Sequence, residues 1–398
     1  MPRFEPFAGL RYRMTADHEE LTAPPYDVID EMEREALAGR SPFNAVHLEL
    51  PVDDENGDRY QRAARLLREW REKGIVAPDD PTAVYLYRMG FHDAQGRARQ
   101  TTGVIGALAL SEPGQGDILP HEETTPRAKS DRLRLLEATK ANLSPIWCLS
   151  PARHLSSLAE PLGPPFARST DADGVHHRLW RVTSPAVVDG LTEVVASAPV
   201  IIADGHHRYE TALAYRDQRR AEGAGEGPHD FVMALVVELT EDELWVQAIH
   251  RRLRGLPADL DVVGALSSWF EALPHDDPPS LEAAMVERGA LGLALPDGSC
   301  RLLVPREGAF PGEMADLDAS RLEVARTGLP AHEVSYCHGI EATMGAVAGQ
   351  GGEAAVLLRP VTVDQIGEFA RRGQRMPPKT TYFFPKPRTG MVFRSLVD

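Results

Sequence analysis

Hydrophobic side chains recur at two distinct periods along the first half of the chain, and each period predicts a type of element. Residues 59–73 carry apolar side chains at helical spacing, and Gly74 should end that helix. Asp30 precedes a Glu- and Arg-rich segment, so we expect it to cap another helix. β-branched and aromatic residues recur at 83–89 and 99–109, which predicts two strands.

A short apolar run meets a glycine near the middle of the chain. Residues 200–203 form a predicted strand, Gly205 permits a sharp turn, and a helix is expected to begin near His206. The continuous apolar run at 231–239 predicts a buried strand. Ser130 is expected to be the N-cap of one more helix.

The alternation of helical and strand patterns predicts an α/β or α+β fold with mixed sheets. The chain has 398 residues, 42% of them hydrophobic, which is enough for two or three packed domains. We expect three regions along it. These are an N-terminal α/β region at 1–150, a central strand–turn–helix region at 151–255, and a C-terminal α+β region at 256–398 whose tail returns to the site.

Charge and cysteine content exclude several classes of protein. Lys and Arg total 43 against 59 Asp and Glu, and the net charge of −16 argues against a nucleic-acid or membrane-surface partner. Three widely spaced cysteines suggest neither a disulfide framework nor a cysteine-based zinc site. No signal peptide and no long apolar span are visible, so a cytoplasmic location is expected.

The strongest candidate site follows the strand predicted at 200–203. Asp204, Gly205, His206, His207 and Arg208 place a carboxylate, two imidazoles and a guanidinium at the start of a helix. Amides at a helix N-terminus bind anions, a guanidinium grips phosphate, and histidine moves protons near neutral pH. The alternative is a helix cap with surface histidines. Adjacent histidines point to different helix faces, which disfavours zinc.

A second candidate site lies upstream, in a segment rich in charged residues. Glu122 beside His121 could act as a general base for a hydroxyl or hold a divalent ion, and Thr124 follows closely. Lys129 and Arg132 could balance phosphate charge. The alternative is a solvated acidic loop followed by an ordinary helix start.

A third candidate is the stiff segment 377–387 near the C-terminus. Lys379, Thr380 and Lys386 alternate there with aromatic residues, so one face could bind an anion while the aromatics pack. The alternative is a terminal strand with lysines that extend toward solvent. The sequence contains no Walker-A loop, no GxGxxG after a strand, no GxSxG and no HExxH. The absence of these motifs disfavours a P-loop kinase, a Rossmann oxidoreductase, an α/β-hydrolase and a zincin.

Four segments, in order along the chain, resemble the bacterial and archaeal family known as domain of unknown function 1015. They are PPYDVI at 24–29, HEETTPRAKSDRLRLLEATKANLSPI at 121–146, IADGHHRYETALAYR at 202–216 and MPPKTTYFFPKPRTGMVF at 376–393.

The shorter box at 203–208 is similar to the phosphate-binding box of the ParB/sulfiredoxin-like superfamily. That superfamily includes chromosome-partitioning nucleotide hydrolases, sulfiredoxins and free-serine kinases. The resemblance implies a core element of that type with N- and C-terminal elaborations. It also implies that a nucleotide's phosphates lie over the residues from Gly205 to Arg208, and that the upstream Glu122 activates the substrate hydroxyl.

These features lead to the hypothesis of an enzyme that transfers a phosphoryl group between ATP or ADP and a small hydroxylated metabolite such as serine or phosphoserine. Arg208, His207, Lys379 and Lys386 would neutralise the phosphates, and Asp204 would hold Mg²⁺ or orient a histidine. Two alternatives remain. One is a phosphomonoester hydrolase that needs no nucleotide, and the other is a non-catalytic regulatory protein that binds a nucleotide or phosphometabolite.

Overall fold

The computed structural model describes residues 1–15, 17–55, 57–93, 95–112, 115, 117–120, 127–310 and 317–397. The side chains of residues 127–129 and 278 lie outside this description. The chain forms two compact units. The first comprises Met1–Trp245, Ala370–Gly373 and Pro385–Asp398, and the second comprises Val246–Phe369 and Gln374–Phe384.

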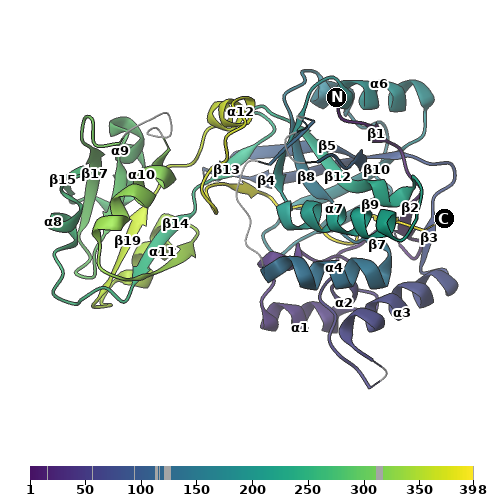
Figure 1. Ribbon diagram of the computed structural model, residues 1–398, viewed down its shortest axis with the longest axis horizontal. Helices are drawn as coiled ribbons and strands as arrows, with labels where there is room; N and C mark the ends of the chain where they lie inside the picture. The colour runs from purple at the N-terminus through teal and green to yellow at the C-terminus, as the bar shows by residue number, and fades with distance from the viewer. Residues whose placement is uncertain are drawn as a thin grey trace. The chain divides into compact units, whose positions relative to one another are not determined.

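A nine-stranded mixed sheet forms the centre of the first unit (Figure 1). Its order is β6-β11-β8-β12-β5-β4-β10-β9, and β1 pairs with β5. Two of its pairings, β12 with β8 and β11 with β6, are parallel, and the others are antiparallel. The strands are β1 (Phe4–Glu5), β4 (Val84–His92), β5 (Ala98–Ala109), β6 (Ile118–Pro120), β8 (Ile146–Ser150), β9 (Ala167–Thr170), β10 (His176–Val182), β11 (Val200–Asp204) and β12 (Phe231–Glu238).

A smaller antiparallel sheet in the same unit brings the two ends of the chain together. Its order is β3 (Val76–Pro78), β2 (Gly9–Tyr12), β21 (Phe393–Ser395) and β7 (Ala141–Asn142). The C-terminal strand β21 therefore pairs with a strand from the beginning of the chain and with one that follows helix α4.

Helices cover the sheets of the first unit. Helix α4 packs against both α7 and α3, and Figure 1 shows it running beside α7. The helices are η1 (Tyr26–Val28), α1 (Glu31–Arg40), α2 (Val46–Glu49), α3 (Arg59–Glu72), α4 (Arg127–Thr139), α5 (Leu155–Leu158), α6 (Pro185–Ala196), α7 (His206–Ala221) and η2 (Pro228–Asp230).

The second unit is built on a six-stranded antiparallel sheet of order β15-β17-β16-β19-β14-β18. A further pair, β13 with β20, forms a two-stranded sheet. The strands are most of β13 (Trp245–Gln247), β14 (His250–Arg254), β15 (Phe270–His275), β16 (Leu291–Ala294), β17 (Cys300–Pro305), β18 (Glu333–Cys337), β19 (Glu353–Leu357) and β20 (Tyr382–Phe384). The helices are α8 (Val262–Leu266), η3 (Pro278–Ser280), α9 (Leu281–Arg288), α10 (Asp318–Ala325), η5 (Arg326–Gly328), α11 (Ile340–Val347) and most of α12 (Val363–Arg371).

The expectation of a mixed α/β fold is confirmed, and so are most of the local predictions. Helix α3 buries Tyr60 and Trp70, and Gly74 just beyond it has a φ of +68°. Asp30 caps α1, since its side chain accepts a hydrogen bond from the amide of Glu33. Strand β12 is buried at every position, as its continuous apolar run predicts.

One helix start was predicted wrongly. Helix α4 begins at Arg127, so Ser130 lies inside the first turn and is not its N-cap. A serine is tolerated within a helix, and its preference for capping positions is only statistical. Here Leu135, which packs against α3, and Leu136, which packs against Tyr215 of α7, give α4 its tertiary contacts.

The division into units also differs from the three regions expected from composition. Strand β8, at the end of the first expected region, pairs with β11 and β12 of the second. A boundary near residue 150 would therefore cut through one hydrogen-bonded sheet. The change of unit along the chain falls between Trp245 and Val246 instead.

Two glycines give a test of the sheet packing. A β-carbon at Gly103 in β5 would lie 2.6 Å from the backbone oxygen of Val236 in β12, so Gly103→Ala must separate the two strands. Nothing lies within 4 Å of the corresponding position at Gly190 in α6. We expect Gly103→Ala to lower the free energy of unfolding by about 1–3 kcal/mol. Gly190→Ala should raise it by about 0.5–1 kcal/mol, because alanine favours a helix. Urea unfolding followed by circular dichroism measures both, and equal effects would contradict the close approach of β5 and β12.

Candidate functional site

The candidate site is built on the turn between β11 and α7. Asp204 is the last residue of β11, and Gly205 is the N-cap of α7 with φ 88° and ψ 27°. A β-carbon at position 205 would also lie 3.0 Å from the guanidinium of Arg208. The turn therefore requires glycine both for its left-handed backbone and for the arginine that folds over it. Gly205 has no side chain with which to cap the first turn of α7, and backbone amides at a helix N-terminus can bind an anion.

Asp204 is a largely buried carboxylate held between two cations. Arg208 Nη2 donates to Asp204 Oδ2 at 2.8 Å, and Lys386 Nζ donates to Asp204 Oδ1. The three side chains are only 11–13% exposed. Burial by itself would raise the pKa of Asp204, but the charges of Lys386 and Arg208 lower it far below its usual range. Two cations thus share one ionised carboxylate at the turn.

Arg208 also ties the turn to the segment that leads into β8. Its Nη1 donates to Ser144 Oγ at 3.1 Å and to the carbonyl oxygen of Pro145. Burial would lower the pKa of Arg208, but Asp204 and other acidic neighbours raise it, so the guanidinium stays charged. Among the described residues, its Nε has no hydrogen-bond partner.

The two histidines occupy the first positions of α7. His206 lies near enough to Asp204 that its charge would help to lower the pKa of that carboxyl. His207 Nε2 is buried and meets no hydrogen-bond partner within the described part of the chain. A buried imidazole nitrogen without a hydrogen bond lowers the stability of the folded state unless a ligand or a water molecule binds to it.

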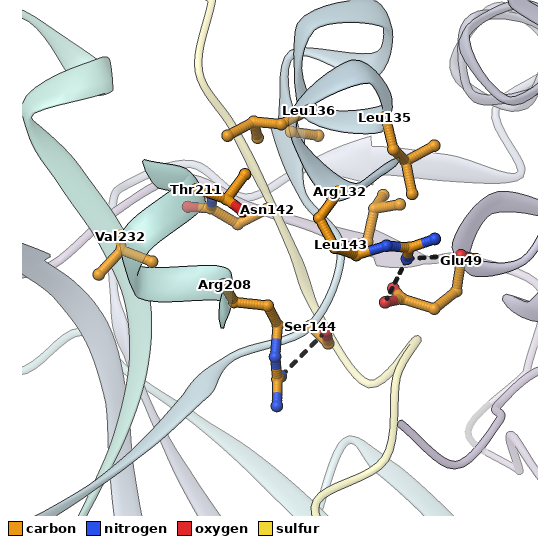
Figure 2. A pocket seen from close by; sticks show the side chains of 11 residues that line it. Glu49, Arg132, Leu135, Leu136, Asn142, Leu143, Ser144, Arg208, Thr211 and Val232 are labelled. Atoms are coloured by element: carbon orange, nitrogen blue, oxygen red, sulfur yellow. Dashed lines mark hydrogen bonds and ion pairs between the residues drawn. The ribbon is translucent and has the colours of Figure 1, made fainter. Parts of the chain in front are cut away.

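Arg132 lies on the other side of a small cavity of about 50 Å³ beside the turn (Figure 2). Its Nη1 donates to the backbone oxygen of Glu49 at 2.9 Å and lies 3.5 Å from Glu49 Oε1. Its Nη2 pairs with Asp131 Oδ2 at 2.6 Å. The cavity is lined by Glu49, Arg132, Leu135, Leu136, Ala141, Asn142, Leu143, Ser144, Arg208, Thr211 and Val232.

Sequence reasoning missed Glu49, which ends helix α2 and is buried. Its signal was weak, because it is a single acidic residue within the mostly apolar stretch AVHLELP at 45–51. Burial raises the pKa of Glu49, whereas Arg132 and Arg208 lower it, and the net shift is upward. A buried carboxyl in a polar cavity is a candidate for ligand binding.

Tyr26, from the segment PPYDVI, lies against this group of residues. The Arg132 guanidinium is 4.4 Å from the centre of its ring. Burial raises the pKa of Tyr26 to about 12, while the charge of Arg208 opposes the shift. The phenol is therefore neutral near pH 7 and is unsuited to act as a base.

The structure places the remaining predicted site residues as follows. His121, Glu122 and Thr124 lie outside the described residues, and of Lys129 only the backbone, in α4, is described. Lys379 and Thr380 belong to the second unit. There Arg251 Nη2 donates to the backbone oxygen of Lys379 at 2.9 Å, and Thr380 Oγ1 donates to that of Pro377 at 2.6 Å. Their roles in binding phosphate remain predictions.

The donor set at Asp204 does not fit a magnesium ion. Both carboxylate oxygens already accept from cationic side chains, and a divalent ion there would face the charges of Lys386 and Arg208. Within the described ranges, no group of three or more His, Cys, Asp or Glu side chains could hold a metal. We therefore assign no step to a metal at Asp204.

Comparison with known proteins gives the family. The sequence matches the family described as protein of unknown function (DUF1015) over residues 4–320. The chain belongs to this family. No curated protein matches it. Among the described helices, none combines the length and the apolar character needed to cross a membrane.

Several solved structures are distantly similar to this member of the DUF1015 family. A variant of free serine kinase in complex with ADP is 14% identical, with a TM-score of 0.37, and the match covers 69% of this chain and 90% of that one. A conserved hypothetical protein from Pyrococcus furiosus is 14% identical, with a TM-score of 0.36 and coverage of 68% and 88%. SbnI from Staphylococcus aureus is 11% identical, with a TM-score of 0.35 and coverage of 72% and 85%.

The ion pairs of Asp204 predict a pH-dependent contribution to stability. Asp204→Asn should lower the free energy of unfolding at pH 7 by about 3 kcal/mol, because two buried cations lose their counter-charge. The folded pKa of Asp204 lies below the unfolded value of about 3.9, so the ionised form stabilises the protein above that pH. The difference between wild type and variant should shrink as the pH falls below about 4. Urea unfolding between pH 7 and pH 3 measures it.

The matched control is Glu69→Gln, which removes an exposed carboxylate paired with Lys73. Its effect should stay below about 1 kcal/mol at every pH. A difference for Asp204→Asn that grows toward low pH would contradict the ion pairs.

Proposed function

We propose that this protein transfers a phosphoryl group between a nucleotide, ATP or ADP, and a small hydroxylated metabolite of the serine or phosphoserine type. One observation carries the proposal. Helix α7 begins at a left-handed glycine that has no side chain, and Arg208 and Lys386 share a single, largely buried carboxylate beside it. We propose further that β11, the turn and α7 form a ParB/sulfiredoxin-like core element.

The electrostatics of the turn favour a phosphate ligand. Arg208 and Lys386 bring two positive charges against the one negative charge of Asp204. The dipole of α7 adds a partial positive charge at the same end of the helix. Gly205 has no side chain to keep a phosphate away from the backbone amides. The side-chain charges, the helix dipole and the access to the backbone amides all favour an anion at the N-terminus of α7.

Each residue of the turn then has a distinct role in the proposed reaction. The amides of α7 and the charge of Lys386 bind the phosphates. Arg208 fixes the turn through Asp204 and Ser144 and adds its charge to the same end of the helix. His207 donates from Nε2 to a phosphate oxygen, which would satisfy that buried nitrogen.

Proton transfer is assigned to a residue outside the described ranges. We propose that Glu122 takes the proton from the attacking hydroxyl, as the resemblance of the box implies. Phosphoryl transfer needs little covalent chemistry from the protein, so positioning and charge stabilisation by such groups can supply most of the rate. Lys379, Thr380 and Lys129 are proposed as further phosphate-binding residues.

Product analysis separates the proposed function from its alternatives. Purified protein is incubated with ATP and serine, and separately with phosphoserine in the presence and absence of ADP, with Mg²⁺ in every reaction. Phosphorus NMR should show the phosphoryl group moving between nucleotide and serine. Free phosphate from phosphoserine without ADP would instead indicate a hydrolase. Nucleotide binding by calorimetry without turnover on a panel of hydroxylated metabolites would indicate a regulatory protein.

Lys386 provides the sharpest test of the binding geometry. Lys386→Met keeps the length of the side chain and removes its charge, so it should weaken ADP binding by roughly tenfold to a hundredfold, the loss expected for a charged hydrogen bond. Isothermal titration calorimetry measures the affinity. Lys73→Met, at the exposed lysine that follows α3, should bind ADP like wild type.

A melting curve shows whether Lys386→Met is folded under the conditions of the titration. A folded Lys386→Met variant with wild-type affinity for ADP would rule out phosphate binding by Lys386.

A further inference from the structure

A buried line of hydrogen bonds holds the C-terminal segment two residues after Lys386. The amide of Arg388 donates to the Tyr87 hydroxyl at 3.0 Å, and that hydroxyl oxygen lies 2.7 Å from His177 Nδ1. On the other side of the imidazole, His177 Nε2 lies 3.0 Å from Asp171 Oδ2. Tyr87 and His177 are fully buried, so water does not compete for the bonds between them.

The protonation states of these groups fix the direction of the hydrogen bonds. Burial lowers the pKa of His177 and raises that of Tyr87, so both are neutral near pH 7. Burial would raise the pKa of Asp171, but the hydrogen bond from His177 lowers it, and the ionised carboxylate can only accept. His177 therefore donates from Nε2 to Asp171 and accepts from the Tyr87 hydroxyl at Nδ1. The Tyr87 oxygen in turn accepts from the amide of Arg388.

The side chain of Arg388 and the residue that follows it are held as well. Arg388 Nη2 donates to the backbone oxygen of Thr22 at 2.9 Å, and Nε donates to Thr22 Oγ1 at 3.3 Å. Thr389 and Ala23 exchange two backbone hydrogen bonds, of 2.8 and 3.0 Å. Buried groups of the first unit therefore set the position of the backbone at Arg388.

The residues around Lys386 carry this position over to its ammonium group. Lys386 lies between Pro385 and Pro387. A proline fixes its own φ at about −65° and restricts the backbone of the residue before it. A shift of the backbone at Arg388 therefore moves Lys386, because few backbone rotations remain to absorb the shift. The ammonium group of Lys386 is the donor to Asp204 at the turn.

We propose that Tyr87, His177 and Asp171 are positioning residues that set the place of Lys386 at the turn. They act through the backbone of Arg388 and need no contact with a ligand. The consequence for nucleotide binding rests on the proposed function, in which Lys386 binds the phosphates. The positioning itself can be measured without a nucleotide.

Tyr87→Phe tests the positioning in the absence of any ligand. The variant removes the acceptor of the Arg388 amide, so the segment should open more often and expose the amine of Lys386. Reductive methylation of the full chain, followed by mass spectrometry, should modify Lys386 at least about three times as fast as in wild type. The exposed Lys73 provides the reference rate within each sample.

The matched control is Tyr85→Phe, two residues earlier on β4. The Tyr85 hydroxyl also accepts from a backbone amide, that of Gly9, and donates to a carboxylate, that of Asp79, both at 2.9 Å. The two variants thus lose the same kind of hydroxyl, but Tyr85 holds the start of β2 whereas Tyr87 holds Arg388. Tyr85→Phe should leave the methylation rate of Lys386 within about twofold of wild type.

Calorimetry connects the positioning with nucleotide binding. Tyr87→Phe should weaken ADP binding by about threefold to tenfold, the scale of one lost hydrogen bond, and Tyr85→Phe should not. In the Lys386→Met background, Tyr87→Phe should have little further effect, because the ammonium group that it positions is absent. A purely structural role of Tyr87 would weaken ADP binding by the same factor in both backgrounds.

Asp171→Asn tests the direction of the hydrogen bonds with almost no change of shape. Asp171 Oδ1 accepts from two backbone amides of the turn that follows it, so the asparagine should keep its oxygen there and direct its NH₂ group toward His177. His177 would then carry its hydrogen on Nδ1, and the Tyr87 hydroxyl would lose its acceptor. Nitrogen-15 NMR should show this change of tautomer, and Lys386 should again be methylated faster. This variant carries the test if a melting curve shows that Tyr87→Phe is unfolded.

The outcomes separate this inference from the proposed function. Unchanged methylation of Lys386 in a folded Tyr87→Phe or Asp171→Asn variant, or equal acceleration in Tyr85→Phe, would overturn the positioning role. An equal loss of ADP affinity with and without Lys386 would overturn it as well. Faster methylation in Tyr87→Phe but not in Tyr85→Phe, in a protein that does not bind ADP, would leave the positioning standing and remove the proposed phosphoryl transfer.

Discussion

The buried carboxylate of Asp204 is the constraint on which the site depends. A charge that is almost out of solvent must be compensated, and Asp204 is compensated by Arg208 four residues later and by Lys386 from the end of the chain. These two ion pairs join a central strand, the helix that follows it and the C-terminal segment. If the carboxylate were neutral, two cations would remain buried beside the N-terminus of α7. The conformation of the turn, its charge and the position of the C-terminal segment therefore depend on the same two ion pairs.

Arg208 connects these ion pairs to the cavity beside the turn. Through Ser144 and the carbonyl of Pro145 it fixes the segment before β8, and on its other side it lines the space that Glu49 and Arg132 share. Helix α4 carries Arg132 and packs against α7, so the two arginines are presented by adjacent helices. Neutral Tyr26 covers Arg132. The arrangement places Arg208 and Lys386 at the turn and, next to it, a small cavity that Glu49, Arg132 and Arg208 line together.

The candidate site could be predicted from sequence wherever its parts are neighbours in the chain. Asp204, Gly205 and Arg208 stand within five residues, and the apolar run before them shows where the strand ends. Ser130 was misplaced as an N-cap because a capping preference is weaker than the packing of a whole helix on its neighbours. The three expected regions differ from the two compact units because composition carries no information on which strands pair. Glu49 was missed because its burial depends on residues far away in sequence.

The sequence by itself determined the local elements: the amphipathic helix over 59–73, the buried strand at β12, and a strand–turn–helix that only glycine can close at position 205. These follow from side-chain periodicity and backbone sterics, which act over a few residues. Only the tertiary structure decided that Lys386 neutralises Asp204 across 182 positions, and that Glu49, Arg132 and Arg208 enclose one cavity. Such contacts depend on the pairing of strands and the packing of helices, which bring together residues whose spacing in the chain reveals nothing of their distance.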